Sequence, residues 1–261
     1  PFQSQFLPLS KKYILVSASY AVRSNLIDFG FPVSESPVIY PGARVELFSH
    51  STPLTFPIES SNLLVQQGFP LGSAKNPLKI GFAGLMMASK GPHTIVEALV
   101  NLNKMGYAIQ ANFAGASFQP SYSEYLQSLI YKADLSGVVS FLGDLNRRKL
   151  ARFWSLHHIG IFPSIFPEAF GISSAEVMAA GALLISSGVG GAQEIFQDRI
   201  SGLRFEADNS QSLTEALLYV LHNPHILKSI ASSGATRINE LFSVRSSALQ
   251  LQQLFIQLAT T

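Results

Sequence analysis

The chain has 261 residues, of which 47% are hydrophobic and only 13% are charged, and its formal net charge is +2. That charge is too small to indicate a nucleic-acid-binding surface or a polybasic membrane patch, and the absence of cysteine excludes disulfides, thiolate metal sites and a cysteine nucleophile. No apolar run reaches the roughly 18 residues that a membrane-spanning helix requires. The low charged share, about half of the usual quarter, predicts a large buried fraction or apolar surface that another part covers.

The first 50 residues predict only a small part of a domain. Residues 13–31 have the pattern of one strand followed by one helix, and residues 37–48 that of a strand and a turn. A single βα unit cannot bury its own apolar faces, so this head is expected to belong to a larger unit. The first residue is proline instead of methionine, which is compatible with a fragment of a longer protein, and the start lacks the pattern of a signal peptide. Residues 52–77, rich in Pro, Ser, Gly and Asn, predict a connecting segment.

From residue 78 onward, short apolar segments alternate with helical ones. The expected strands are residues 78–84, 107–115, 138–143, 159–164, 182–187 and 202–205, and the expected helices between them are residues 91–103, 121–135, 146–158 and 171–180. This alternation predicts βαβ units with right-handed crossovers, and therefore an α/β, doubly wound, Rossmann-like parallel sheet with helices on both faces. Five clear strands are too few for an eight-stranded barrel. From residue 210 to the end the pattern is helical only, with breaks at 222–224 and 241–244.

Two glutamates, Glu168 and Glu176, have seven residues between them in an otherwise apolar stretch. Glu168 lies in the loop after an expected strand, and Glu176 about one and a half turns into the next helix. Ligands of open α/β sheets bind at this carboxyl edge, where a helix N-terminus attracts anions and a carboxylate accepts hydrogen bonds from hydroxyl groups. A sugar nucleotide would satisfy all three features. The alternative is that Glu168 is a solvated loop residue and that Glu176 pairs with a nearby Arg or Lys.

Residues 168–181, EAFGISSAEVMAAG, resemble the signature of the retaining group-1 (GT4-like) glycosyltransferases of the GT-B fold. The resemblance implies that Glu168 contacts the donor sugar near the reacting centre, as a catalytic residue, and that Glu176 binds the ribose hydroxyls. It also implies main-chain contacts with the sugar and phosphates. The donor-binding residues that it implies in this region are Ser164, Phe170, Gly171, Ile172 and Glu176.

Residues 78–99 resemble the first strand and loop of the nucleotide-binding domain of the same family. Gly84 is thereby implied as a donor-binding residue and Lys90 as the catalytic lysine that holds the diphosphate. The arginine that usually accompanies this lysine would fall at Leu85 and is absent. Arg147 or Arg148 is a candidate replacement.

Two further stretches carry the resemblance. Residues 138–154 match a segment whose backbone, here around Asp144 and Leu145, lines the base pocket, so that Leu145 is implied as donor-binding. Residues 188–205 match a loop near the phosphates, in which Glu194 is expected to be structural more often than functional. His157 and His158 are expected to be packing and surface residues. No ligand-spaced cluster points to a bound metal, and no cofactor is expected.

The resemblance covers about residues 13–250 and implies three parts. Residues 1–45 would be a remnant of the N-terminal, acceptor-side domain, residues 46–240 the nucleotide-sugar-binding domain, and residues 241–261 a helix that packs back on the N-terminal half. The implied activity is metal-independent transfer of a sugar from a nucleoside diphosphate sugar to a hydroxyl acceptor, in polysaccharide or glycoconjugate synthesis. The chain alone is expected to be inactive because most of the acceptor half is missing.

The sequence leaves several alternatives open. The chain is alternatively a nucleotide-sugar-binding module or fragment without turnover, whereas nothing favours a phosphorylase or an epimerase of the same fold. The expected partners are a nucleotide-sugar donor and a carbohydrate or lipid-linked saccharide acceptor, without nucleic acid. The expected location is cytoplasmic, and contact with the cytoplasmic face of a membrane stays open. The nucleobase, the sugar, the acceptor and the oligomeric state are not specified.

Overall fold

A computed structural model describes residues 14–49 and 69–260. Its centre is one parallel sheet with the strand order β3-β2-β1-β4-β5-β6. The strands are β1 (Leu78–Ala83), β2 (Ile109–Ala114), β3 (Val139–Gly143), β4 (Ile159–Phe162), β5 (Leu183–Ser186) and β6 (Leu203–Arg204). Each expected strand from residue 78 onward is present within two residues of its expected bounds, and the predicted doubly wound α/β fold is confirmed. The order reverses between β1 and β4, which is the point where such sheets bind ligands.

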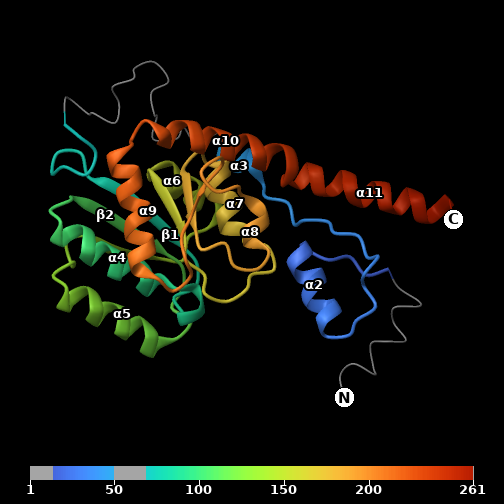
Figure 1. Ribbon diagram of the computed structural model, residues 1–261, viewed down its shortest axis with the longest axis horizontal. Coiled ribbons are helices and arrows are strands. Elements are labelled where there is room, and N and C mark those ends of the chain that lie inside the picture. The colour runs from blue at the N-terminus through green and yellow to red at the C-terminus, as the bar shows by residue number, and fades with distance from the viewer. Residues whose placement is uncertain (1–13, 50–68, 261) are drawn as a thin grey trace.

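Helices cover both faces of the sheet (Figure 1). On one face lie α4 (Pro92–Lys104), α5 (Pro120–Lys132) and α9 (Ser210–His222). On the other face lie α3 (Val45–Ser49), α6 (Arg147–Ser155), α7 (Ile172–Ala179), α8 (Ala192–Ile195) and most of α10 (Ile226–Leu241). The remaining elements are α2 (Tyr20–Asp28), a 3-10 turn η1 (Ala88–Lys90) and α11 (Val244–Thr260).

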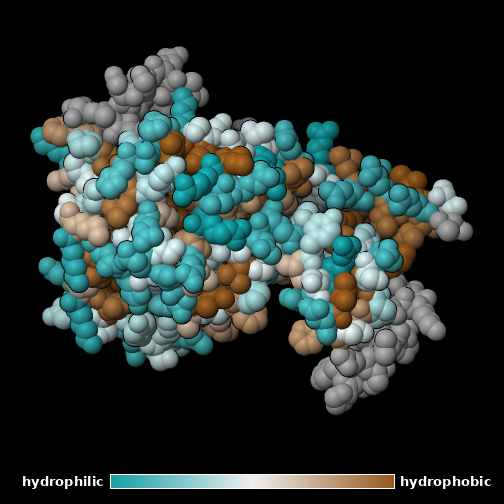
Figure 2. Space-filling model, viewed as in Figure 1, coloured by the Kyte–Doolittle hydropathy of each residue, from teal (hydrophilic) through white to brown (hydrophobic). Residues whose placement is uncertain are grey.

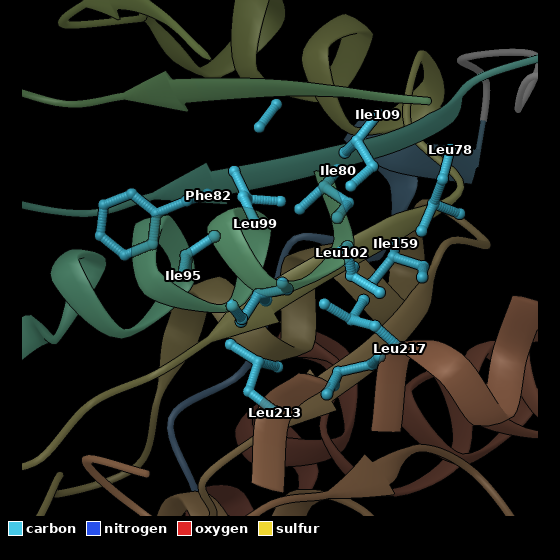
Figure 3. Packing of buried hydrophobic residues seen from close by; sticks show 14 of the residues in the cluster. Leu78, Ile80, Phe82, Ile95, Leu99, Leu102, Ile109, Ile159, Leu213 and Leu217 are labelled. Atoms are coloured by element: carbon cyan, nitrogen blue, oxygen red, sulfur yellow. The ribbon is translucent and has the colours of Figure 1, made fainter. Parts of the chain in front are cut away.

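The strands divide their side chains between two apolar cores because successive residues of a strand point to opposite faces. Ile80 of β1 and Ile159 of β4 point toward the first face, where they meet Leu99 of α4 and Leu217 of α9 (Figure 3). All four side chains are fully buried. The near-continuous apolar strand sequences are therefore explained by burial on both faces.

The second face is built from smaller strand residues. Gly160 of β4 lets α7 and α6 approach the sheet closely, because a Cβ there would overlap the methyl groups of Val177 and would lie 3.0 Å from Trp154. Trp154 is one of the largest fully buried side chains in the part of the chain that the structure describes. The indole ring takes the space that the glycine leaves.

The head of the chain differs from the sequence expectation. Where strands were expected between residues 14 and 49, the structure contains isolated bridges instead, Ser17 with Val38 and Ala43 with Ser243. The strand expected at the start of residues 13–31 and the strand expected within residues 37–48 are therefore wrong over their described residues. Apolar, β-rich segments form strands only where a neighbouring strand pairs with their main chain. The expected helix is present as α2. Residues 45–49 form α3, whose Phe48 is buried against the second face of the sheet.

The tail is helical as predicted, with breaks after His222 and Leu241. Helix α11 projects beyond the sheet and above α2 (Figure 1). Apolar side chains show along this projecting helix (Figure 2). The exposed ones are Val244, Leu249, Leu251, Phe255, Ile256 and Leu258.

Helix α11 contacts the head of the chain at several points, and at its first residue Val244 N donates a hydrogen bond to Ala43 O at 3.0 Å. Ser247 Oγ donates a hydrogen bond to Tyr40 O at 2.7 Å. Leu254 and residues near Ile14 and Pro32 line a common groove of about 440 Å³. The expectation that this helix packs on an N-terminal half stays a prediction, as do the three domain boundaries. Across residues 14–49 and 69–260, no helix combines the length and hydropathy that crossing a membrane requires.

The packing at Gly160 yields a test of the second core. Gly160→Ala is expected to lower the free energy of unfolding by about 1–3 kcal/mol, because the added methyl group overpacks the contact with Val177. Gly137→Ala is the matched control, since a Cβ there meets no heavy atom within 4 Å. Urea denaturation followed by circular dichroism measures both. Equal midpoints for the two variants would contradict this account of the face.

Candidate binding site at the carboxyl edge of the sheet

A pocket of about 260 Å³ opens at the carboxyl ends of β1, β2 and β3. Its walls are mainly small or apolar, and Ser173 of α7 closes one side. The lining includes Gly84, Leu85, Gly115, Asp144, Leu145 and Ser173. Three residues from the sequence prediction, Gly84, Asp144 and Leu145, therefore lie in one pocket, together with the leucine that stands in place of the expected arginine. Such a pocket can hold a flat ring against the main chain.

Lys90 and Glu168 meet beside the start of α7. Lys90 Nζ lies 2.6 Å from Glu168 Oε1, and Ser164 Oγ donates a hydrogen bond to the same oxygen. The Lys90 side chain is 30% exposed and that of Glu168 is 16% exposed, so the ion pair is partly accessible from solvent. Three of the residues predicted from separate stretches are thus brought together.

The contact depends on how the loops after β1 and β4 pack. Gly91 follows Lys90 with a left-handed conformation, φ +66°, and any Cβ there would overlap Pro163 O. Ile165 N donates to Ser89 O at 2.9 Å, which joins the two loops from the other side. The Lys-Gly pair therefore has a structural reason: only glycine permits the approach that carries Lys90 to Glu168.

A third loop holds the main chain of Glu168. Glu168 N donates to Val189 O at 3.2 Å, and Gly191 N donates to Glu168 O at 2.7 Å. The loop after β5 thus holds the main chain of Glu168, while Lys90 and Ser164 bond to its carboxylate. The sequence indicated this glycine-rich loop as part of the site, but not these two bonds.

Helix α7 begins and ends at glycines in left-handed conformations, Gly171 with φ +103° and Gly181 with φ +75°. At its end, Gly181 N bonds to Met178 O and Ala182 N to Val177 O, which is the pattern of a Schellman stop. At its start, the N–H groups of Ile172 and Ser173 precede the first intrahelical bond and remain directed toward the edge of the sheet. Such an end attracts anions.

The two residues that flank Gly171 differ in exposure. Ile172 is 42% exposed, whereas Phe170 is 3% exposed and packs against Tyr40 and Phe242, with ring centroids 5.9 and 5.7 Å away. The side chain of Phe170 therefore belongs to the core. Only its main chain is left for a ligand.

Glu176 is the one buried carboxylate among the described residues, with 8% exposure. Burial raises its pKa to about 7, while the charge of Arg147 acts in the opposite direction and so does the nearby indole of Trp154. The Trp154 N–H itself has no hydrogen-bond partner of good geometry. Of the two arginines suggested to replace the missing one, Arg147 thus acts on this site.

The other polar residues singled out in the sequence have packing roles. His157 is 3% exposed; its Nδ1 bonds to Phe153 O at 2.7 Å and its Nε2 to the Asn112 amide at 2.9 Å. Burial lowers its pKa to about 4. His158 Nδ1 accepts a hydrogen bond from Lys79 N at 3.1 Å. In the described residues, no three His, Asp or Glu side chains gather as they would around a metal ion.

Ser173 is a functional candidate that the sequence did not single out. It lines the pocket from the first turn of α7, next to the open N–H groups. A serine in an ordinary first helical turn has no distinctive pattern. The one sequence feature that could have indicated Ser173 is its position between Gly171 and Glu176, inside the predicted site.

The buried carboxylate makes stability depend on pH. The pKa of Glu176 is near 7 in the folded chain and near its ordinary value when unfolded, so the folded state binds more protons between these values, and stability falls as the pH rises through this window. Glu176→Gln is expected to be more stable than the parent at pH 8, by on the order of 2 kcal/mol, and nearly equal to it at pH 5. Denaturation at both pH values measures this. A gap that does not grow with pH would contradict the burial effect.

The comparisons with known sequences give a family. The model of the family "Glycosyl transferases group 1" matches residues 66–237. A D-inositol 3-phosphate glycosyltransferase of Corynebacterium urealyticum is 28% identical over 233 residues, which cover 85% of this chain and 51% of that protein. An uncharacterized glycosyltransferase of Methanocaldococcus jannaschii is 26% identical over 173 residues, covering 66% of this chain and 43% of that one. The chain spans about half the length of the curated relatives it matches.

Solved structures share the fold. A glycosyltransferase of Rickettsia africae superposes with a TM-score of 0.82 at 22% identity, over 98% of this chain and 66% of that one. HepE of Anabaena in complex with UDP and glucose superposes with a TM-score of 0.79 at 22% identity, over 95% of this chain and 65% of that one. The C-terminal domain of a group 1 glycosyl transferase of Francisella tularensis superposes with a TM-score of 0.61 at 21% identity. The match covers 78% of this chain and 100% of that domain. The chain belongs to the group 1 glycosyl transferases, with the GT-B fold, and corresponds to their C-terminal part.

Proposed function

We propose that this chain is the donor-binding part of a retaining glycosyltransferase, which moves a sugar from a nucleoside diphosphate sugar to a hydroxyl acceptor. One observation carries the proposal: Lys90 and Glu168, 78 positions apart in sequence, form an ion pair at the carboxyl edge of the sheet, beside the open N-terminus of α7. A cation, a carboxylate and a helix N-terminus in one place suit a ligand that carries both hydroxyl groups and phosphates.

The order of groups along the site suggests how the donor lies. The base would occupy the pocket beside Gly84 and Leu145, and the ribose hydroxyls would donate to Glu176. The diphosphate would lie at Gly171 and Ile172, where α7 begins. The sugar would then reach Glu168.

The chemistry follows from charge. When the bond between the sugar and the diphosphate breaks, negative charge grows on the leaving diphosphate, and Lys90 together with the first N–H groups of α7 would stabilise it. Positive charge grows at the anomeric carbon, where Glu168 would stabilise it and orient the sugar. The acceptor would enter on the face that the leaving group vacates, which retains the configuration. These charges are supplied by side chains and main chain, so we propose transfer without a metal ion, and we assign no general base to this chain.

Binding of the donor requires the Lys90–Glu168 pair to separate, because Lys90 cannot serve the diphosphate fully while it is held by Glu168 at 2.6 Å. Because Leu85 stands where the family usually has an arginine, the site has one cation fewer for the phosphates than the family pattern implies. Arg147, whose charge acts on Glu176, is our candidate to supply it. The phosphates would then be held chiefly by Lys90 and the helix end.

The wider role rests on the relatives. HepE was solved with UDP and glucose, and TarM of Staphylococcus aureus with UDP and α-GlcNAc-glycerol. We propose a carbohydrate or lipid-linked saccharide acceptor and a role in polysaccharide or glycoconjugate synthesis. A cytoplasmic location, with contact at the cytoplasmic face of a membrane as an open part of the proposal, would suit such acceptors.

A thermal-shift panel tests the donor site. UDP, GDP and ADP, and their hexose derivatives, are added in excess, and at least one is expected to raise the melting temperature, because a ligand that binds only the folded state stabilises it. Glu176→Ala and Lys90→Ala are each expected to abolish the rise. Glu240→Gln, a change at an exposed helix position, is the control and should keep it. An undiminished rise in Glu176→Ala would remove the ribose role.

The second candidate function is a nucleotide-sugar-binding module without turnover, which is favoured by the share of the relatives that this chain spans. We expect the 261 residues alone to bind a donor but to transfer little or no sugar, since they span only about half the length of these relatives. Release of free nucleoside diphosphate in the presence of acceptor saccharides, measured by a coupled assay, checks this. Robust turnover would show that these residues suffice for catalysis.

A further inference from the structure

Glu194 of α8 binds the start of helix α2 across 174 positions of sequence. Its Oε2 accepts a hydrogen bond from Tyr20 N at 3.0 Å and its Oε1 one from Ala21 N at 2.8 Å. Ser19 Oγ accepts the next main-chain donor, Val22 N, at 3.1 Å. The first three N–H groups of α2 are thus satisfied, two of them by one carboxylate, which also complements the positive end of the helix.

Tyr40, in the chain segment that follows α2, also binds Glu194. We call the contacts of Glu194 with the start of α2 and with Tyr40 the joint. Its hydroxyl group donates to Glu194 Oε2 at 2.8 Å. Its ring packs against Phe170, with centroids 5.9 Å apart, and against Phe242, with centroids 4.9 Å apart. Tyr40 therefore touches both Glu194 and the residue two positions after Glu168.

The main chain at Glu194 is held just as firmly from the opposite side. Arg237 of α10 donates from Nη2 to Glu194 O at 3.0 Å and from Nε to Ile195 O at 2.8 Å. Ile195 is fully buried. The short helix α8 is therefore fixed between α10 and the head of the chain.

The same loop reaches Glu168. Gly191, three residues before Glu194, donates from its N–H to Glu168 O at 2.7 Å, and Val189 O accepts from Glu168 N. A Cβ at Gly191 would lie 2.6 Å from Ser19 Oγ, so the cap of α2 rests directly on this loop. One loop thus bonds to Glu168 by its main chain and to α2 by the side chain of Glu194.

We infer that Glu194 is a positioning residue: by docking α2 and Tyr40 on the loop after β5, it holds Glu168 in the orientation that a donor sugar requires. The inference rests on the proposed function, since it assigns Glu194 to the sugar end of that donor site. Glu194 itself does not touch the donor. Its loss would loosen the head of the chain and the Glu168 loop together, while the pocket at β1, β2 and β3 stays as it is.

The test distinguishes the contribution of the sugar to binding from that of the nucleotide. Dissociation constants are measured by calorimetry for the pairs UDP and UDP-glucose, GDP and GDP-mannose, and ADP and ADP-glucose, with the parent chain, Glu194→Gln and Tyr40→Phe. Glu194→Gln is expected to reduce the preference for the hexose derivative over its nucleoside diphosphate several-fold, while the affinity for the diphosphate alone is unchanged. Tyr40→Phe, which keeps the ring and the two main-chain bonds of Glu194, should reduce the preference less.

Hydrogen exchange and a matched variant complete the design. Glu194→Gln should lose amide protection at residues 20–23 and 189–191, whereas Glu240→Gln should match the parent in both measurements. If Glu194→Gln lost amide protection at residues 20–23 but kept the parent's preference for the hexose derivatives, the inference would be overturned. The contacts of Glu194 would then stabilise the head of the chain without affecting the binding of the sugar. Failure of the parent to bind any of the six compounds would instead contradict the proposed function itself.

Discussion

The contact of main-chain loops at the carboxyl edge of the sheet determines the rest of the site. The loops after β1, β4 and β5 meet there, and each meeting uses a glycine because no Cβ fits between the chains. Gly91 admits Pro163 O, and Gly191 admits Ala169 O. Residues that are far apart in sequence come within bonding distance only through these contacts. The packing of the loops therefore brings Lys90 and Glu168 close enough to form their ion pair.

The site combines a solvent-accessible charge pair with a buried carboxylate, and these serve different ends. Lys90 and Glu168 form an ion pair that is partly exposed to water, which suits groups that must meet a charged substrate and release it. Glu176 lies inside, where burial raises its pKa to about 7. Hydroxyl groups of a ligand would favour the ionised form, so binding and deprotonation of Glu176 would be linked. In the free chain the charge of Arg147 offsets part of the cost of burying this carboxylate.

Much of the sheet and part of the site could be predicted from the sequence because their signals are local. The alternation of apolar strands and helices predicted every strand from residue 78. The same pattern predicted that Glu168 lies in a loop and Glu176 in the following helix, but not that Glu176 is buried. Other features leave no local trace. The bonds of Glu194 to Tyr20 and Ala21 span more than 170 positions, and the burial of Phe170 depends on Tyr40 from the head. The strands expected before residue 49 failed because strand formation needs a neighbour, which a segment's own residues do not reveal.

The two left-handed glycines that bound α7 have a consequence for how such a site can vary. Between Gly171 and Gly181 the helix has a fixed start and a fixed stop, and Glu176 lies at its fifth position. One inserted residue would turn Glu176 by about 100° around the helix axis, away from the edge of the sheet. The segment can therefore accept substitutions but not a change of length. Adaptation to a different ligand would have to come from the walls of the pocket, such as Leu85 and Leu145, while the number of residues between the two glutamates stays constant.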